Sequence, residues 1–383
     1  MMQNSLGILC VLVLIEMLIL FFSESARTKK FFQFPPALFW IYFLPMIVSG
    51  LGIIPEQHAI YPKITSTVLP AGLILLLIVT DIKAILKLGR SALLMMFTGS
   101  AGIMVGAPLV VMLFKPWLPA DAWSGFGALS ASWIGGSANM IAVKEAIHTP
   151  DAVFFPMIVV DTVVAYSWMG LLILSEGFQK TYDIWNRSDL HVVKELARKT
   201  VSSETSAQKI RFQYLPLILA AAFGGAWISN WLANIVGNGS FAWTIILAST
   251  FGILLSFTSL RKLESHGASR IGYLFLFLVL TSIGARANLS GVLSAPLLIV
   301  AGVVLVLIHA VFLLTVSRIA RIPFCLVATA SQANIGGPAS APIVAAAYEP
   351  ALAPVGLLLG ILGNVMGTYL GLLTSFLCRW AGS

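Results

Sequence analysis

SASWIGGSAN at Ser130–Asn139 and SQANIGGPAS at Ser331–Ser340 are two helix-breaking decapeptides inside apolar segments, 201 positions apart. Each is rich in small and polar residues and has a glycine pair near its centre. Two adjacent glycines destabilise a helix and free backbone groups that lipid cannot satisfy. Such breaks therefore persist only where protein or a water-filled cavity surrounds them. Each decapeptide is a candidate binding site.

The composition around these breaks is that of a polytopic, all-α membrane protein. Of the 383 residues, 58% are hydrophobic and 10% are charged, which is too little polar surface to cover a soluble globule. The net charge of +8 does not indicate nucleic-acid binding, because the basic residues lie in short loops between apolar runs, where they report topology. Motifs for metal, phosphate or nucleophilic chemistry are missing from the sequence, so we expect no cofactor and no enzymatic activity.

The apolar runs divide the chain into two halves of five expected spans each. Residues 1–175 form the first repeat, residues 176–213 a polar cytoplasmic linker with a helix around His191–Lys199, and residues 214–383 the second repeat. The ten expected spans are Leu6–Phe22, Ala37–Ile54, Thr67–Leu86, Ser91–Phe114, Ala152–Ser175, Tyr214–Val236, Phe241–Leu260, Ile271–Ala287, Val292–Val316 and Ala351–Leu377.

The two glycine-broken segments, Trp123–Ile147 and Pro323–Ala347, would each be either one broken span or a re-entrant hairpin. If both are hairpins and both termini lie outside, 18 of the 23 basic residues fall on the inner side. If both span, the best orientation places only 15 there. The positive-inside rule therefore favours ten spans plus two hairpins. The expected location is the cytoplasmic (inner) membrane of a bacterial-type cell.

An odd number of spans per half makes the two halves run in opposite directions, so the repeat is expected to be inverted. Sequence identities recur at the offset of 201, above all in the two glycine pairs and in Gly170-Leu171-Leu172 against Gly371-Leu372-Leu373. Inverted repeats whose broken elements meet near the midplane are typical of secondary transporters.

The breaks supply the candidate binding residues. The helical legs after Gly136 and Gly337 would direct free N–H groups and positive dipole ends toward one point, which suits a small anionic solute. Close packing of small residues is the alternative explanation of both motifs. The predicted substrate-binding residues are Ser130, Ser132, Gly135, Gly136, Ser137, Asn139, Gln332, Asn334, Gly336, Gly337 and Ser340.

Asp161 lies near the middle of the apolar run Ala152–Ser175. A carboxylate at membrane depth is costly and is by default a functional residue, here one that couples sodium or protons, with any sodium bound near it. A neutral, hydrogen-bonded structural aspartate is the alternative. Asn364 lies two positions beyond the repeat partner of Asp161 and is the second predicted ion-coupling residue. His309 lies inside the expected span Val292–Val316, and for it we expect a buried, neutral, hydrogen-bonded side chain more than a proton relay.

The motif Ser-Trp-Ile-Gly-Gly-Ser-Ala-Asn-Met-Ile-Ala-Val from Ser132, with Pro150-Asp151, Asp161 and the stretch Gln332–Gly337, resembles the YjcL-like family of multi-pass membrane proteins, a family of unknown function (DUF819). More distantly, five helices plus one glycine-containing hairpin per repeat are similar to symporters of the cation:proton antiporter / anion transporter superfamily. That resemblance implies an elevator arrangement, with the hairpins in a moving domain. Those symporters include sodium-coupled citrate and glutamate carriers, but the sequence departs from the citrate-carrier pattern around Pro338, so the resemblance does not imply citrate as the substrate.

We therefore expect a cation-coupled secondary transporter of a small organic anion, driven by sodium or protons, with the lipid bilayer as its environment and homodimerisation left open. A sodium/proton antiporter that uses Asp161 is the alternative within transport. A non-transporting membrane enzyme or sensor is the alternative from another class.

Overall fold

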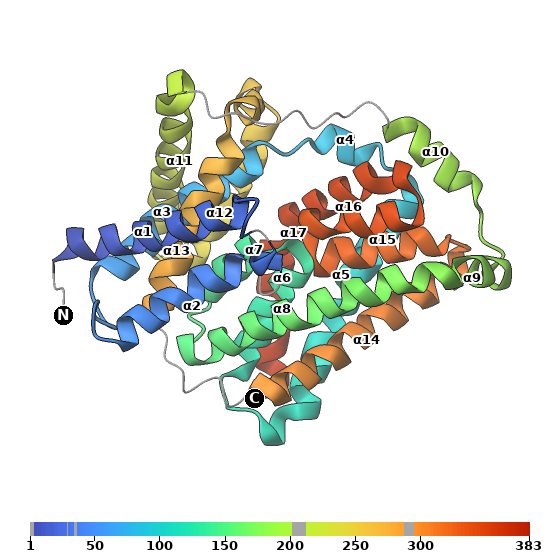
Figure 1. The fold of residues 1–383 in the computed structure, drawn as a ribbon, viewed down its shortest axis with the longest axis horizontal. Coiled ribbons are helices and arrows are strands. Elements are labelled where there is room, and N and C mark those ends of the chain that lie inside the picture. Colours follow the sequence, from blue (N-terminus) through green and yellow to red (C-terminus); the bar gives the residue numbers. More distant parts are fainter. Residues whose placement is uncertain (1–3, 29, 34–36, 201–211, 287–294) are drawn as a thin grey trace. The chain divides into compact units, whose positions relative to one another are not determined.

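The fold is described from a computed structural model, which covers residues 4–28, 30–33, 37–200, 212–286 and 295–383. Residues 201–211 of the expected linker, residue 287 of the expected eighth span and residues 292–294 of the expected ninth span lie outside this part. Every regular element of the described residues is a helix, as the composition predicts. The helices form two compact units, and each unit draws segments from both halves of the sequence (Figure 1).

Unit 1 comprises residues 1–80, 150–162 and 208–295. Its core lies where α3 packs against α11, α12 and α13, around side chains such as Ile74, Ile218 and Ile271. Glycine allows close approach of these helices: a methyl group on Gly252 would lie 2.9 Å from the Cβ of Leu77, and one on Gly72 would lie 3.3 Å from the carbonyl oxygen of Gly272. The helices of unit 1 are α1 (Ser5–Glu24), α2 (Ala37–Gly50), α3 (Ile60–Ile78), α11 (Leu215–Val236), α12 (Phe241–Ser256) and α13 (Ala268–Arg286).

Unit 2 comprises residues 81–149, 163–207 and 296–383, and it contains both glycine-broken segments. Its core is formed by α5, α15 and α17, with smaller contributions from α4, α10, α14 and α16. The helices of unit 2 are α4 (Ile82–Leu86), α5 (Gly89–Phe114), α6 (Ala122–Gly135), α7 (Ser137–Ala146), α9 (Gln179–Asn186), α10 (His191–Thr200), α14 (Ala295–Ala320), α15 (Phe324–Ile335), α16 (Gly337–Tyr348) and α17 (Ala353–Gly382).

The long helix α8 (Asp151–Leu174) contributes to both units. Its residues through Thr162 cluster with unit 1, and those from Val163 onward cluster with unit 2. Figure 1 shows it as one continuous helix.

All ten expected spans correspond to helices. Eight of the helical segments in the described residues are long and apolar enough to cross a bilayer. The other two expected spans correspond to α2, with 14 residues, and α12, with 16 residues. α12 meets the length and hydropathy requirements only together with the 3-10 segment Ser259–His266, to which it is bent by 94°.

The expected span Thr67–Leu86 is wrong at both ends. Helix α3 begins earlier, at Ile60, and ends at Ile78. The chain then breaks, and the Asp81 carboxylate accepts the backbone N–H of Ala84 at 3.0 Å, which starts the separate helix α4. Aspartate is a preferred N-terminal capping residue, so it favours a new helix start over continuation of α3.

The first part of the polar stretch after α8 packs against the rest of unit 2 and fixes the start of α15. Asp183, in α9, accepts the backbone N–H of Phe324 at 2.9 Å, which caps α15 from another segment. Asn186 donates its side-chain N–H to the carbonyl oxygen of Ile322 at 3.0 Å, and the backbone N–H of Asp189 donates to that of Arg321 at 2.9 Å. The helix expected around His191–Lys199 is present as α10.

Candidate functional site

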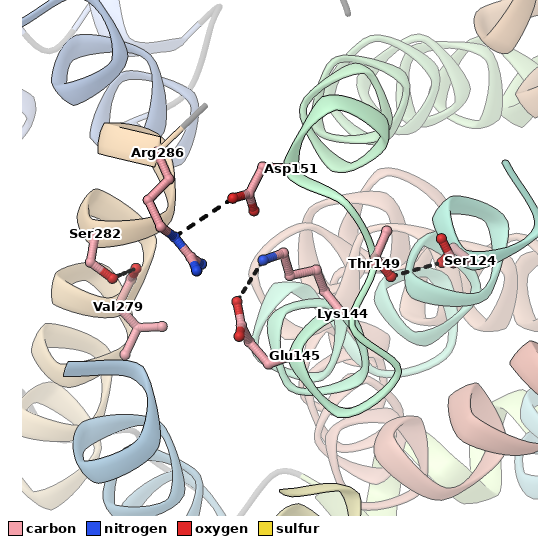
Figure 2. Close-up of polar contacts among 8 residues, drawn as sticks. All are labelled: Ser124, Lys144, Glu145, Thr149, Asp151, Val279, Ser282 and Arg286. Atoms are coloured by element: carbon pink, nitrogen blue, oxygen red, sulfur yellow. Dashed lines mark hydrogen bonds and ion pairs between the residues drawn. The ribbon is translucent and has the colours of Figure 1, made fainter. Parts of the chain in front are cut away.

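Both glycine-broken segments fold back on themselves. The Thr149 hydroxyl, just after α7, donates to the carbonyl oxygen of Ser124 near the start of α6 at 3.3 Å (Figure 2). The rings of Phe324 and Tyr348, at the first residue of α15 and the last of α16, have centroids 5.9 Å apart. A straight helix of this length would separate its ends by about 37 Å. The two segments are therefore helical hairpins, the form that the charge distribution favoured.

Each hairpin turns at one glycine that adopts a left-handed backbone angle. Gly136 has φ +84° between α6 and α7, and Gly337 has φ +63° at the first residue of α16. Side-chain-bearing residues rarely adopt this region, whereas glycine enters it freely. The glycine pairs thus break the helices where the sequence predicts, and the two turning glycines are partners at the offset of 201.

Helix α17 packs against both hairpins through one glycine face. A methyl group on Gly360 would meet the backbone of Pro338 at 2.5 Å, and one on Gly367 would meet the Cα of Gly135 at 2.7 Å. Between them, Gly363 lies against the carbonyl oxygen of Ile134. The stretch 360–367 covers about 10 Å along the helix axis. Both breaks therefore lie on the same two turns of α17.

The break of the first hairpin is fixed by Asn139. Its side-chain N–H groups donate to the carbonyl oxygens of Gly135 at 2.5 Å and of Asn364 at 3.2 Å. Its side-chain oxygen accepts the hydroxyl of Thr368 at 2.5 Å. The Asn139 amide is 2% exposed and uses both of its ends within the protein. Its contacts fasten the hairpin to α17.

The predicted residue Asn334 is also held by the protein. Its side-chain oxygen accepts the Ser100 hydroxyl at 2.8 Å, and its N–H groups donate to the carbonyl oxygens of Met96 at 3.2 Å and Ala330 at 3.1 Å. It is completely buried. Asn334 therefore joins α15 to α5 and is not directed toward the break.

Gln332 differs from these two amides because only one of its ends has a partner. Its side-chain N–H donates to the Ser340 hydroxyl oxygen at 2.7 Å, across the break from α15 to α16. Its side-chain oxygen is buried and has no hydrogen-bond partner among the residues that the structure describes. A methyl group on Gly336 would collide with both polar side chains, so the glycine leaves room for this crossing.

His309 lies in a directed hydrogen-bond chain inside unit 2. Its Nδ1 is 2.9 Å from the carbonyl oxygen of Gly99, so Nδ1 carries the proton and donates. Nε2 then accepts from the Ser331 hydroxyl at 2.9 Å, and the Ser331 oxygen accepts the Trp168 indole N–H at 2.9 Å. Neutral His309 satisfies every contact of this chain. The structural interpretation of His309 therefore fits better than a proton relay.

The Ser331–His309 pair has the spacing of a nucleophile and its base but lacks the rest of such a site. Ser331 lies inside α15, where backbone N–H groups make helical hydrogen bonds and are not presented to a developing oxyanion. The Trp168 indole also donates to the oxygen that would attack a substrate. The geometry favours a role in helix packing.

An apolar pocket lies beside this chain, between α8, α14 and α15. Aliphatic and aromatic side chains make up most of its lining, with hydroxyl and indole groups only at Ser331, Ser175 and Trp168. An anion would lose its hydration there without gaining compensating donors. The breaks of the hairpins are better suited to a polar solute.

The breaks combine opposite helix ends without charged side chains. At each break, the negative C-terminal end of one helix (α6 or α15) lies next to the positive N-terminal end of the other (α7 or α16). Segments 130–143, 324–348 and 353–378 contain no Asp, Glu, Lys or Arg. Such an arrangement suits a cation and an anion that bind together, since each has an oppositely polarised helix end available.

The remaining predicted residues of the first hairpin and Asn364 lie in or near the first break. Ser130 is buried in α6, and its hydroxyl donates to the carbonyl oxygen of Phe126 at 2.7 Å, one turn before. Ser132 accepts the N–H of Gly136 on its carbonyl oxygen at 2.5 Å, and Ser137 begins α7. The side-chain oxygen of Asn364 lies near the first break, 3.3 Å from where a methyl group on Gly136 would be.

Asp161 is half-buried in α8 and clusters with unit 1, whereas both hairpins and Asn364 belong to unit 2. Its role in ion coupling stays a prediction.

Sequence reasoning missed Thr368 and Ser100, the partners of Asn139 and Asn334. Their only sequence signal is a hydroxyl within an apolar helix, and that is too common to single them out.

Within unit 1, the end of α13 is paired with the start of α8. Arg286 Nε lies 3.6 Å from Asp151 Oδ2, and both side chains are about one-fifth exposed (Figure 2). The acid at a helix N-terminus and the base at a helix C-terminus each match the helix dipole. The predicted topology places both residues on the outer side. In unit 2, Lys144 and Glu145 form a second ion pair at 2.6 Å.

Comparison with known proteins also identifies the chain as a membrane protein. The family model described as "Protein of unknown function (DUF819)" matches residues 10–379. The chain is 24% identical over 359 residues to the "Uncharacterized membrane protein YjcL" of Bacillus subtilis (strain 168), and the match covers 88% of each chain. Together with the apolar helices, this similarity establishes a multi-pass integral membrane protein.

Proposed function

The chain belongs to the DUF819 family, whose description names no activity, and we propose that it is a cation-coupled secondary transporter of a small organic anion. The observation that carries the proposal is the packing of two hairpin breaks on one glycine face of α17. Broken helices that present their ends to one region are the usual substrate and ion sites of secondary transporters.

The polarity of the breaks supports an anion together with a cation. The N-terminal ends of α7 and α16 favour a carboxylate or another anion, and the C-terminal ends of α6 and α15 favour a cation. A site without fixed charges gains little from either ion alone but accommodates a neutral pair. Coupling between the two ions follows from this mutual compensation.

The division into two compact units supports an elevator mechanism. Both hairpins and α17 belong to unit 2, and unit 1 contains neither hairpin. A unit that has its own core and contains both breaks is able to move as a body, because the groups at the breaks stay together. Inversion of the two halves stays a prediction.

The test is uptake by the purified, full-length protein in proteoliposomes. Radiolabelled mono-, di- and tricarboxylates are supplied under an inward sodium gradient or an inward proton gradient, with empty liposomes as the control. We expect gradient-dependent accumulation of at least one of them. Sodium-driven proton efflux without any carboxylate would favour the antiporter instead. Failure of every gradient to drive solute or ion movement would refute a transport function.

A further inference from the structure

We propose that the break of the second hairpin is a binding site for a monovalent metal cation of about the size of sodium, with the Gln332 side-chain oxygen as a ligand. The proposal rests on the proposed transport function and names the ion and its position. The observation behind it is the side-chain oxygen of Gln332, a residue that is 1% exposed, which has no hydrogen-bond partner among the described residues. A buried acceptor without a partner is uncommon and calls for an occupant.

The neighbouring groups favour a cation over an anion. The free atom is an acceptor, because the amide N–H is already directed to Ser340 at 2.7 Å. The site lies at the C-terminal end of α15, where the helix dipole is negative. Pro338 has no N–H for the carbonyl oxygen of Asn334, four residues earlier, so another backbone oxygen at this end lacks its helical donor.

Oxygen ligands without a carboxylate suit a metal ion and do not suit a proton. An amide oxygen or a backbone carbonyl does not take up a proton at physiological pH, whereas both are ordinary ligands of hard cations. Segment 324–348 contains no charged side chain, so the cation would bring the only full charge to this hairpin. The site therefore selects a metal ion as the coupling ion.

The turn of this hairpin is open at Gly337. Gly337 has φ +63°, and a methyl group placed on it would have no neighbour within 4 Å. At the first break, by contrast, the Asn139 amide is fully bonded and Asn364 lies close to Gly136. The two hairpins are therefore not equivalent, and the cation belongs to the second.

The test measures cation-dependent thermal stabilisation of the full-length protein in detergent, with NaCl, LiCl or KCl replacing choline chloride at constant ionic strength. We expect saturable stabilisation by sodium in the wild type and an affinity about ten- to a hundredfold lower in Gln332→Leu, because one ligand to a charged ion is lost. The matched control is Thr329→Val. It removes a buried hydroxyl from the same helix, one that donates to the Cys325 carbonyl oxygen at 2.7 Å, and it should keep the sodium response.

Gln332→Glu keeps an oxygen ligand and tests the site if the leucine variant does not fold. The proposal expects its sodium response to persist and to weaken as acid protonates the carboxylate. A site that used the amide nitrogen for an anion would instead lose its ligand in this variant. The proposal is overturned if sodium does not stabilise the wild type more than choline does. It is also overturned if Gln332→Leu keeps wild-type sodium affinity, or if folded Gln332→Glu has no sodium response.

Flux in proteoliposomes separates this proposal from the transport function. If the wild type accumulates an anion under a sodium gradient while Gln332→Leu binds sodium normally, the cation site is refuted and transport stands. If sodium binds through Gln332 but no gradient drives solute uptake, the transport function is refuted and the site stands.

Discussion

Replacement of Gly135 by alanine should destabilise unit 2 through a collision between the first hairpin and α17. The added methyl group would lie 2.5 Å from the Asn139 side-chain nitrogen, 2.5 Å from the Gly363 carbonyl oxygen and 2.6 Å from the Gly367 Cα. Ordinary contacts of a methyl carbon are 3.4–4 Å. Two of the three neighbours are backbone atoms of α17, which cannot move away by changing a rotamer.

The magnitude follows from two opposing terms. Overpacking of a close-packed interface costs about 1–3 kcal/mol, and contact with backbone atoms places Gly135→Ala at the upper end. The higher helix propensity of alanine offsets about 1 kcal/mol. The net loss is about 2 kcal/mol, which corresponds to a fall in Tm of roughly 4–8 °C for a unit of this size.

Gly170→Ala is the matched control, because Gly170 is also a helical glycine and has no neighbour within 4 Å of an added methyl group. It should raise stability by about 0.5–1 kcal/mol through helix propensity alone. Thermal unfolding of both variants in the same detergent, followed by intrinsic tryptophan fluorescence, measures the difference. Equal Tm values for the two variants, or a stabilised Gly135→Ala, would refute the packing of the first break on α17.

Three further predictions concern the hydrogen bonds of His309, the cap of α15 and the orientation of α12. His309→Ala should lower the free energy of unfolding by about 3 kcal/mol, because it leaves a buried cavity and removes two hydrogen bonds. A Tm within 1–2 °C of wild type in a thermal unfolding measurement would contradict the hydrogen-bond chain. Asp183→Ala should lower stability by about 1 kcal/mol, because the backbone N–H of Phe324 loses its cap. Limited proteolysis should then cleave faster near the start of α15, and unchanged cleavage would count against the cap. Cysteines at the exposed positions Asn238 and Ser265 should be labelled from outside and from inside, respectively; labelling of both from one side would refute a membrane-crossing α12.

Much of this architecture is predictable from sequence because it depends on local properties. A bilayer demands about 20 apolar residues per helix, so apolar runs mark the spans, and paired glycines mark the breaks. The hairpin form also followed from sequence, since loop charges report sides. The error at Thr67–Leu86 has a local cause as well: hydropathy does not detect that Asp81 caps a new helix.

The partners of the polar side chains were not predictable, because they depend on packing between distant segments. Asn139 and Thr368 are separated by 229 positions, and Ser100 and Asn334 by 234. Sequence assigns every amide near a break to the binding site with equal weight. Only the structure shows which amide already has both ends bonded and which has a free oxygen.

The two hairpins differ in the position of the amide that contacts the break. At the offset of 201, Asn139 corresponds to Ser340, and Gln332 corresponds to Ala131. The glycine pairs coincide, but the amide lies after the break in the first hairpin and before it in the second. Asn139 of the first hairpin bonds to α17. Gln332 of the second donates across the break to Ser340, and its oxygen has no partner among the described residues. The two hairpins thus surround similar glycine pairs with different side-chain contacts, and we expect the cation at the second.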